Sequence, residues 1–240
     1  MEIVAVYDQK KPPERPVVAG KSAVTLVGGG TLRPVDLEAA LALAPVLVAV
    51  DSGADAVSAA GLTPTAVIGD LDSVSAAVRA RLPPDIFHEI TEQDSTDFDK
   101  ALRHLAVPLV LAVGFTGARI DHELAVFHSM VTRPQHRCIV IGERDVIFHA
   151  PPRLRMHLTP GTRVSLFPMG AVSGRSRGLR WPIDGLPFHP FRRIGTSNEA
   201  TGGAVEIETD APGLLVILPR AELDAAVAAL SQAGEKLWIV

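Results

Sequence analysis

Two carboxylates stand two residues apart in Gly69-Asp70-Leu71-Asp72-Ser73, directly after the apolar run Ala66-Val67-Ile68. Such a run is typical of the end of a buried strand. Two like charges this close cost free energy unless a cation or hydrogen-bond donors offset them. Carboxylate oxygens suit a hard cation such as Mg²⁺, which usually carries phosphates. An acidic surface turn before the next helix is the equally open alternative for this stretch alone.

Short apolar runs alternate with helical stretches through the first half of the chain. This alternation predicts a parallel α/β sheet with helical crossovers. In such sheets ligands bind beyond the carboxyl ends of the strands. We expect strands at 23–27, 46–50, 66–68, 86–90 and 108–113, and helices at 36–43 (with Asp36 as its cap), 54–60, 75–81, 96–105 and 120–131.

Acidic loops follow several of these strands, namely Asp51-Ser52-Gly53-Ala54-Asp55, the opening stretch, and 91–97 with Asp94 and Asp97. A fourth loop is Gly28-Gly29-Gly30, which reads equally as a plain turn or as a close approach to a ligand. All would open on one face of the sheet, so their carboxylates would converge. Convergence of this kind favours a cation site over an isolated acidic turn.

The loop at 91–97 leads into a helix that Thr96 can cap. Asp97 and Lys100 are three residues apart and therefore near one another on its first turn. A lysine at the front of a helix opposes the helix dipole, so we expect Lys100 to pair with Asp97 or with a phosphate.

A glycine-containing turn, Gly114 to Gly117, precedes Arg119, Asp121 and His122 at the start of the next helix. This places the three side chains near the ligand side of the sheet. Taken singly, a local ion pair between Arg119 and Asp121 and a surface histidine are the simpler interpretations. The helix itself would carry its apolar residues on one face, at Ile120, Leu124, Phe127 and Val131.

The pattern changes near Pro134 to short strands separated by turns, which favours an antiparallel sandwich or barrel. We therefore predict an α/β domain with a mainly parallel sheet at 1–134 and an all-β sandwich domain at 135–240. Strands are expected at 137–141, 145–149, 153–158, 163–167, 204–208 and 214–218, then a helix at 221–233 and an apolar tail at 237–240. An irregular stretch between them holds Trp181, Ser197 and Asn198. The alternatives there are a core or interface anchor for Trp181 and plain turn formers for Ser197 and Asn198.

The composition narrows the class of protein. The 240 residues are 47% hydrophobic and carry a net charge of −4, so no basic footprint for nucleic acid or an anionic membrane exists. The single cysteine, Cys138, fits a reducing compartment. No apolar run approaches the ~20 residues of a membrane span, and the first 21 residues do not read as a secretory signal. We expect a cytoplasmic protein without nucleic-acid or membrane partners.

The chain resembles the thiamine pyrophosphokinase family in six segments that occur in the family's order. Two departures concern nucleotide fit: Asp51-Ser52-Gly53 stands where the family commonly has Asp-Gly-Gly, and Leu124-Ala125-Val126 where it often has an asparagine. The matching segments are 51–55, 69–73, Gln93-Asp94-Ser95-Thr96-Asp97-Phe98-Asp99-Lys100-Ala101-Leu102, 117–122, Gly178-Leu179-Arg180-Trp181 and Thr196-Ser197-Asn198-Glu199.

The resemblance implies a homodimer whose active sites lie between one subunit's α/β domain and the partner's sandwich domain. The implied reaction is Mg²⁺-dependent transfer of a diphosphate from ATP to thiamine, which gives AMP and thiamine diphosphate. The resemblance suggests that Asp70, Asp72 and Asp97 bind Mg²⁺, with Asp51 and Asp94 in support. Lys100 and Arg119 would balance the charge of the triphosphate, and phosphate or nucleotide contacts would come from Gly29, Ser73, Thr96 and His122. Thiamine would stack on Trp181, and its aminopyrimidine would form hydrogen bonds with Ser197 and Asn198. The base stays open among Asp70, Asp97 and Asp121.

Two other functions compete with this one. Another nucleotide-dependent phospho- or pyrophosphotransferase could share the acidic face and differ in its acceptor. A non-catalytic nucleotide- or thiamine-binding protein would bind without turnover. A Walker kinase is excluded because no Gly-x-x-x-x-Gly-Lys-Ser/Thr occurs, and a Rossmann dehydrogenase is disfavoured because the glycine run lacks the spaced fingerprint.

Overall fold

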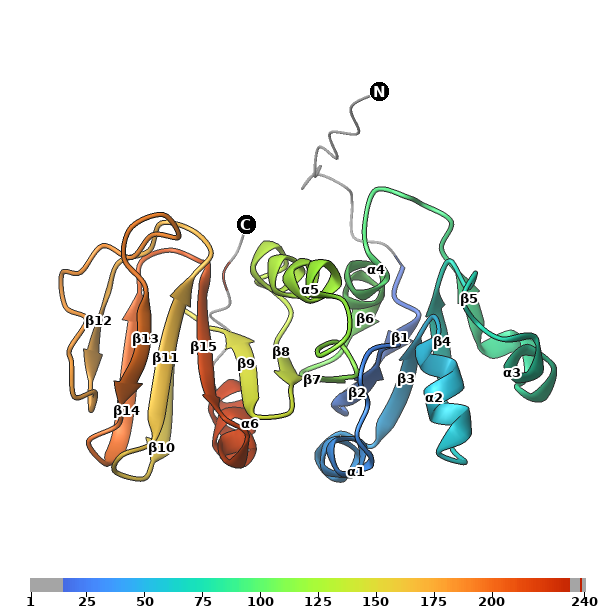
Figure 1. Cartoon of the computed structure of the whole chain (residues 1–240), viewed down its shortest axis with the longest axis horizontal. Helices are drawn as coiled ribbons and strands as arrows, with labels where there is room; N and C mark the ends of the chain where they lie inside the picture. The colour runs from blue at the N-terminus through green and yellow to red at the C-terminus, as the bar shows by residue number, and fades with distance from the viewer. Residues whose placement is uncertain (1–14, 234–237, 239–240) are drawn as a thin grey trace. The chain divides into compact units, whose positions relative to one another are not determined.

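The computed structural model describes residues 15–233 and residue 238 (Figure 1). Their contacts divide the chain into two compact units. The first holds the described residues up to Pro108 together with Val113–Val126, and the second holds Leu109–Ala112 and the described residues from Phe127 onward. Strand β7 (Val110–Val113) thus groups mostly with the second unit, although it precedes the boundary predicted at residue 134.

The first unit is built on four parallel strands in the order β2 (Val24–Val27), β3 (Val46–Val50), β4 (Ala66–Gly69) and β5 (Phe87–Glu89). The residues of β2 and β4 are buried throughout, as expected for strands that are covered on both faces. The connections contain α1 (Pro34–Leu43), α2 (Gly53–Ala59), α3 (Ala76–Arg81), η1 (Pro84–Ile86) and α4 (Asp97–Arg103). The predicted parallel α/β arrangement is confirmed for this unit, and it brings the strands' carboxyl ends to one edge.

Several helix boundaries test the predicted caps. Ser75 and Thr96 cap α3 and α4 through their side chains. The cap predicted at Asp36 is wrong, because α1 begins at Pro34, which needs no backbone N–H there, and Asp36 pairs with Arg33 at 2.7 Å. The helix predicted to reach residue 105 ends at Arg103, since the next residues form β6 (Leu105–Ala106), which pairs with β1 (Val18–Ala19).

Helix α5 (Ile120–Thr132) does not bury the whole apolar face that was predicted for it. Ile120 is 69% exposed and Leu124 is 56% exposed, whereas Val126 and Met130 are buried. Periodicity located the helix, but it did not identify the apolar stripe that faces the core.

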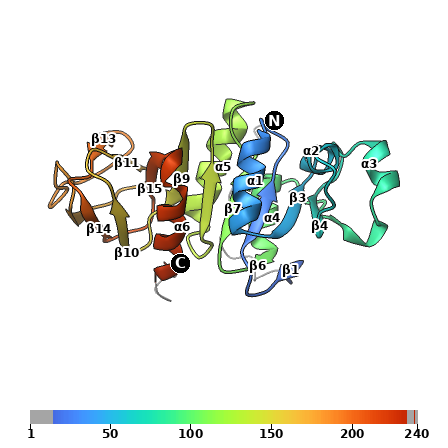
Figure 2. The ribbon, with the colours of Figure 1, turned by 90° about the horizontal axis from the view of Figure 1, so that it is seen from below.

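The second unit is rich in antiparallel strands. One set pairs in the order β13 (Gly195–Glu199), β11 (Arg163–Pro168), β15 (Leu214–Pro219), β9 (Asp145–His149) and β8 (Cys138–Ile141). A separate sheet has the order β10 (Arg153–Leu158), β14 (Gly203–Thr209) and β12 (Gly174–Arg177). After η2 (Arg220–Glu222), helix α6 (Leu223–Gln232) contacts β10 and β8 (Figure 2). A β-rich unit is therefore confirmed, and its packing as a sandwich stays a prediction.

Two strands of this unit were not predicted from the sequence. β12 and β13 lie in the stretch predicted to be irregular. Their sequences, Gly-Arg-Ser-Arg and Gly-Thr-Ser-Asn-Glu, have weak strand propensity, so pairing with β14 and β11 decides their conformation.

Trp238 of the predicted tail donates a hydrogen bond from Nε1 to the Ala150 carbonyl at 3.0 Å. The rest of the tail lies outside the described residues, as do residues 1–14. No helix in the described part of the chain combines the length and apolar character needed to cross a bilayer.

A buried histidine couples the second unit's stability to pH. His149, the last residue of β9, is buried, and its Nε2 accepts a hydrogen bond from the Gly213 amide at 2.8 Å. Burial lowers the pKa of His149 to about 4, from an ordinary value of 6.5. The folded protein therefore keeps this ring neutral at pH values where the unfolded chain protonates it.

We predict that acidification from pH 7.5 to 5.0 costs the wild type about 2 kcal/mol of unfolding free energy through His149 alone. The sign follows because the folded pKa lies below the unfolded one, so stability falls as the pH drops from 6.5 towards 4. His149→Gln keeps an acceptor for Gly213 and should lose this component, as measured by urea unfolding at both pH values. The exposed His157→Gln is the matched control, and an undiminished loss in His149→Gln would contradict the assignment.

Candidate active site

Left-handed backbone conformations shape the loops at the ends of β3 and β4. Asp51, directly after β3, has φ 45°, and Leu71, two residues after β4, has φ 63°. Non-glycine residues rarely adopt this conformation, which costs free energy unless surrounding contacts enforce it. Among the described residues only Ser197, at φ 62°, does the same. All three lie in segments that the sequence analysis assigned to the site.

Three carboxylates from different loops converge beyond the sheet edge. Asp51, Asp70 and Asp97 each offer an oxygen, and these oxygens lie within 4.8 Å of one another. Asp51 is buried, and its pKa is raised, chiefly by burial and further by the charge of Asp97. The Ser73 amide donates to Asp51 Oδ1 at 3.3 Å and offsets part of that cost. Close, hard oxygen donors of this kind suit a divalent cation such as Mg²⁺.

Lys100 supplies a buried positive charge to this cluster. Its side chain is 2% exposed, and Nζ lies 2.9 Å from Asp97 Oδ1 and 3.4 Å from Asp70 Oδ2. Burial lowers the Lys100 pKa, but the hydrogen bonds and charges of the two aspartates outweigh it, so the pKa is raised. The ammonium group therefore stays charged, and the predicted pairing with Asp97 is confirmed.

Helix α4 sets this geometry through its first turn. Thr96 Oγ1 accepts a hydrogen bond from the Asp99 amide at 3.3 Å, which fixes where the helix begins. Asp97 and Lys100 then lie three residues apart on one side of the helix.

The glycine run after β2 permits close packing between loops. The Gly30 amide donates to the Gly114 carbonyl at 2.7 Å, and a Cβ on Gly30 would lie 2.6 Å from that oxygen. A Cβ on Gly29 would lie 2.0 Å from Ser52 Oγ. These contacts leave no room for side chains, so the glycines at 28–30 allow the two loops to pack closely. Gly29 also lines a cavity at this edge of the sheet.

A cavity of about 440 Å³ opens at this edge of the first unit. Phe98 and Phe115 form an apolar wall, with ring centroids 4.8 Å apart and planes at 67°. Neither aromatic residue was predicted to belong to the site, although Phe115 directly follows a strand-end glycine. The lining comprises Gly28–Gly30, Val50–Ser52, Asp70, Asp72, Ser73, Thr96–Phe98, Gly114, Phe115, Ala118, Arg119, His122 and Val126.

Three predicted acids lie outside the carboxylate cluster. Asp72 lines the cavity but is exposed, and its Oδ1 accepts from Ser73 Oγ at 2.8 Å. Asp94 is exposed and does not line the cavity. Asp121 pairs with Arg119 at 2.6 Å, which lowers the Asp121 pKa. The local ion pair is therefore present, while Arg119 still lines the cavity.

Trp181 and Asn198 form a separate arrangement in the second unit. Trp181 is 54% exposed, which contradicts a core anchor and leaves an interface anchor as a prediction. The Arg180 guanidinium lies 4.9 Å from its ring centroid. Buried Asn198 accepts from the Trp181 amide at 3.2 Å and donates to its carbonyl at 2.7 Å. Ser197 and Asn198 lie in strand β13 and are not turn formers. The Asn198 amide thus holds Trp181 in place, and its direct bond to a ligand stays a prediction.

Both units match models of one protein family. The model described as "Thiamin pyrophosphokinase, catalytic domain" matches residues 37–141, and "Thiamin pyrophosphokinase, vitamin B1 binding domain" matches residues 148–214. Among curated proteins, "Thiamine pyrophosphokinase 3" of Oryza sativa subsp. japonica is 30% identical over 155 residues, which span 56% of this chain and 58% of that protein. "Thiamine pyrophosphokinase 1" of Arabidopsis thaliana is 26% identical over 64% of this chain and 65% of its own. The chain thus spans less than two thirds of the length of these relatives.

Solved structures show the same fold. Thiamin pyrophosphokinase from Geobacillus thermodenitrificans aligns with a TM-score of 0.67 and 22% identity, over 85% of this chain and 99% of that one. The yeast enzyme aligns with a TM-score of 0.69 and 16% identity, over 88% and 90%.

The fold and the site define a class of protein with an acidic cavity at the carboxyl ends of parallel strands, followed by a β-rich unit. Within that class, the two family models together account for most of the chain. The chain belongs to the thiamine pyrophosphokinase family.

We predict that Lys100→Met lowers the unfolding free energy by about 1–3 kcal/mol, because Asp70 and Asp97 then repel one another without their buried counter-charge. Methionine preserves the length and the apolar stem of the side chain. Urea unfolding at low ionic strength measures the loss. The exposed Lys21→Met is the control and should change stability by less than about 0.5 kcal/mol. Equal stability of the two variants would show that Lys100 does not compensate the carboxylates.

Proposed function

We propose that this chain is a thiamine pyrophosphokinase, which transfers the β,γ-diphosphate of ATP to the hydroxyl of thiamine and releases AMP. The observation that carries the proposal is the convergence of Asp51, Asp70 and Asp97 at a cavity of the first unit, where buried Lys100 pairs with Asp70 and Asp97 from behind the cavity lining. The residues matched by the catalytic-domain model include all four. The names of the curated relatives supply the acceptor.

The donor set fits Mg²⁺ as the resident metal. We assign Asp70, Asp72 and Asp97 as its ligands, and the position of Asp51 within the 4.8 Å group adds a fourth oxygen donor. Asp72 lies at the exposed side of the cavity, where it would reach metal that arrives with the nucleotide. When bound, Mg²⁺ neutralises charge on phosphate oxygens.

The chain's own side chains then orient the triphosphate. Arg119 lines the cavity and offers a bidentate guanidinium fork to phosphate oxygens. Thr96 Oγ1 accepts its cap hydrogen bond, so its own proton is available to an anion. Lys100, fixed by two carboxylates, contributes a positive charge that needs no reorganisation during the reaction.

The thiamine hydroxyl must lose a proton to a carboxylate. Asp70 and Asp97 line the cavity, whereas Asp121 is exposed and engaged by Arg119. A carboxylate within hydrogen-bond reach of the hydroxyl is the requirement, and Asp70, Asp97 and Asp121 are the three candidates.

Trp181 is proposed to bind thiamine. Its exposed ring offers an aromatic face, and the thiazolium of thiamine is a cation that such a face attracts. Asn198 binds both the backbone N–H and the carbonyl of Trp181, which fixes the main chain that carries the ring.

We predict that the wild type, incubated with ATP, Mg²⁺ and thiamine, forms AMP and thiamine diphosphate in equal amounts, as measured by chromatography. Asp72→Asn should lower kcat at least about 100-fold, because metal binding at the phosphates is weakened. Asp85→Asn, in η1 and outside the cavity, is the matched control and should act within about twofold of wild type.

Other products would exclude the proposed reaction. ADP with a thiamine monophosphate would indicate phosphoryl transfer. AMP release that requires an acceptor other than thiamine would support a pyrophosphotransferase with a different acceptor. Saturable thiamine binding without any AMP would support a binding protein.

We further propose a homodimer whose sites combine the first unit of one subunit with Trp181 of its partner. Two points support this arrangement. The family resemblance implies sites shared between subunits, and the acidic cavity and Trp181 belong to different units of the chain.

Mixed dimers test the shared site. Asp72→Asn and Trp181→Ala subunits, each nearly inactive alone, should regain about a quarter of wild-type activity after subunit exchange, since half of the dimers then hold one intact site. Size-exclusion chromatography with light scattering confirms the dimers. No recovery despite exchange would place the whole site within one chain.

A further inference from the structure

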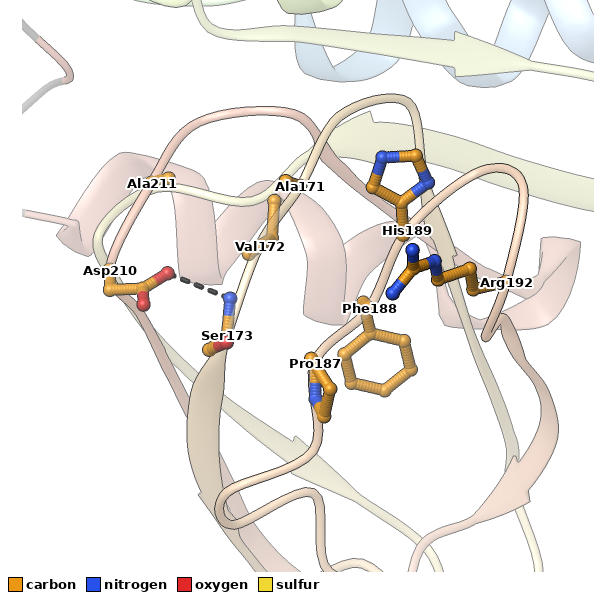
Figure 3. A pocket seen from close by; sticks show the side chains of 9 residues that line it. All are labelled: Ala171, Val172, Ser173, Pro187, Phe188, His189, Arg192, Asp210 and Ala211. Atoms are coloured by element: carbon orange, nitrogen blue, oxygen red, sulfur yellow. Dashed lines mark hydrogen bonds between the residues drawn. The ribbon is translucent and has the colours of Figure 1, made fainter.

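A second cavity, of about 380 Å³, lies in the second unit and shares no lining residue with the first cavity (Figure 3). Three segments build it: the one before β12, the one before β13 and the turn after β14. The lining residues are Ala171–Ser173, Pro187–His189, Arg192, Asp210 and Ala211.

The apolar part of this cavity is firmly held. Val172 and Phe188 are each 3% exposed. The Val172 amide donates to the Phe188 carbonyl at 3.1 Å, and the Phe188 amide donates back at 2.8 Å. These two bonds join two of the three segments, so the cavity has a fixed apolar base.

A tight turn presents donors along one wall. The Arg192 amide donates to the His189 carbonyl at 3.0 Å, and the His189 amide donates to the Arg193 carbonyl at 3.0 Å. The Phe191 amide donates to His189 Nδ1 at 3.1 Å. Neutral His189 therefore carries its proton on Nε2, which is a hydrogen-bond donor.

Arg192 adds a positive charge to the same wall. Figure 3 shows its guanidinium between the rings of His189 and Phe188. Within the described residues, the side chain of Arg192 forms neither an ion pair nor a hydrogen bond. Its five donors are therefore free to meet a ligand.

A carboxylate stands across the cavity from this wall (Figure 3). Asp210 Oδ1 accepts from the Ser173 amide at 2.7 Å, and the Asp210 amide donates to the Ser173 carbonyl at 3.0 Å. This reciprocal pair fixes the carboxylate, so the cavity carries opposite charges at two separated places.

We propose that this cavity binds a small organic anion, a carboxylate or a phosphate ester, that has an apolar body and an amino group at its far end. Arg192 and the Nε2–H of His189 bind the anion, since a guanidinium engages such groups through paired hydrogen bonds. The body lies against the exposed Ala171 and Pro187, above the base that Val172 and Phe188 form, and Asp210 accepts from the amino group. The site is independent of the proposed transfer reaction.

Calorimetry on the full chain tests the site with defined probes. They are 4-(aminomethyl)benzoate, phenyl phosphate and, as a probe without an anion, benzylamine. The wild type should bind at least one of the two anions and bind benzylamine more weakly. Arg192→Gln should weaken anion binding at least about tenfold through the lost charge-assisted bonds. Arg193→Gln removes a neighbouring exposed cation that does not line the cavity and should stay within about twofold of wild type.

The outcomes separate this site from the other sources of binding. Tighter binding of the carboxylate or of the phosphate ester, lost in Arg192→Gln, supports the site and names its anion. Equal losses in Arg192→Gln and Arg193→Gln would reduce the effect to net charge and overturn the proposal. Binding lost only in Arg119→Gln would place the anion in the first cavity. Absence of wild-type binding at about 10 mM probe would also overturn it.

Discussion

The structure depends on one electrostatic constraint, the confinement of three carboxylates to a space where their oxygens lie within 4.8 Å. Such a group is unstable without compensation. The buried ammonium of Lys100, at 2.9 Å from Asp97 and 3.4 Å from Asp70, supplies part of it. Burial raises the pKa of Asp51, and the negative charge of Asp97 adds to this effect. A divalent cation would supply the remainder, and this links the cluster to phosphate chemistry.

Backbone strain and tight loop packing maintain this arrangement. The left-handed conformations of Asp51 and Leu71 direct the chain at the ends of two adjacent parallel strands. The glycines after β2 let a third loop approach Gly114 closely. In the second unit, left-handed Ser197 precedes Asn198, whose amide holds exposed Trp181. Strain is thus concentrated in the segments proposed to bind ligands, where preorganisation favours catalysis.

The spacing of residues in the sequence predicted those features of the site that depend on contacts within one helix turn. The cap at Thr96 and the contact between Asp97 and Lys100 follow from rules that act within a few residues. The parallel sheet was predicted from the alternation of strands and helices along the first half of the chain. Spacing could not show that Asp51 joins Asp70 and Asp97 in the carboxylate cluster while Asp72 lies outside it, because this depends on the backbone at Leu71 and on strand pairing. Exposed Ile120 and the strands β12 and β13 also depend on tertiary contacts that propensity does not encode.

The most direct test of the central claim is the binding of Mn²⁺, which substitutes for Mg²⁺. Electron paramagnetic resonance measures the free Mn²⁺ in a titration and so gives the bound fraction. The claim that Asp51, Asp70 and Asp97 are confined in order to bind a divalent cation predicts a saturable site in the wild type. Asp51→Asn and Asp70→Asn should each lose that site while remaining folded by circular dichroism, and the exposed Asp85→Asn should keep it. Mn²⁺ binding of wild-type strength in Asp70→Asn would contradict the account.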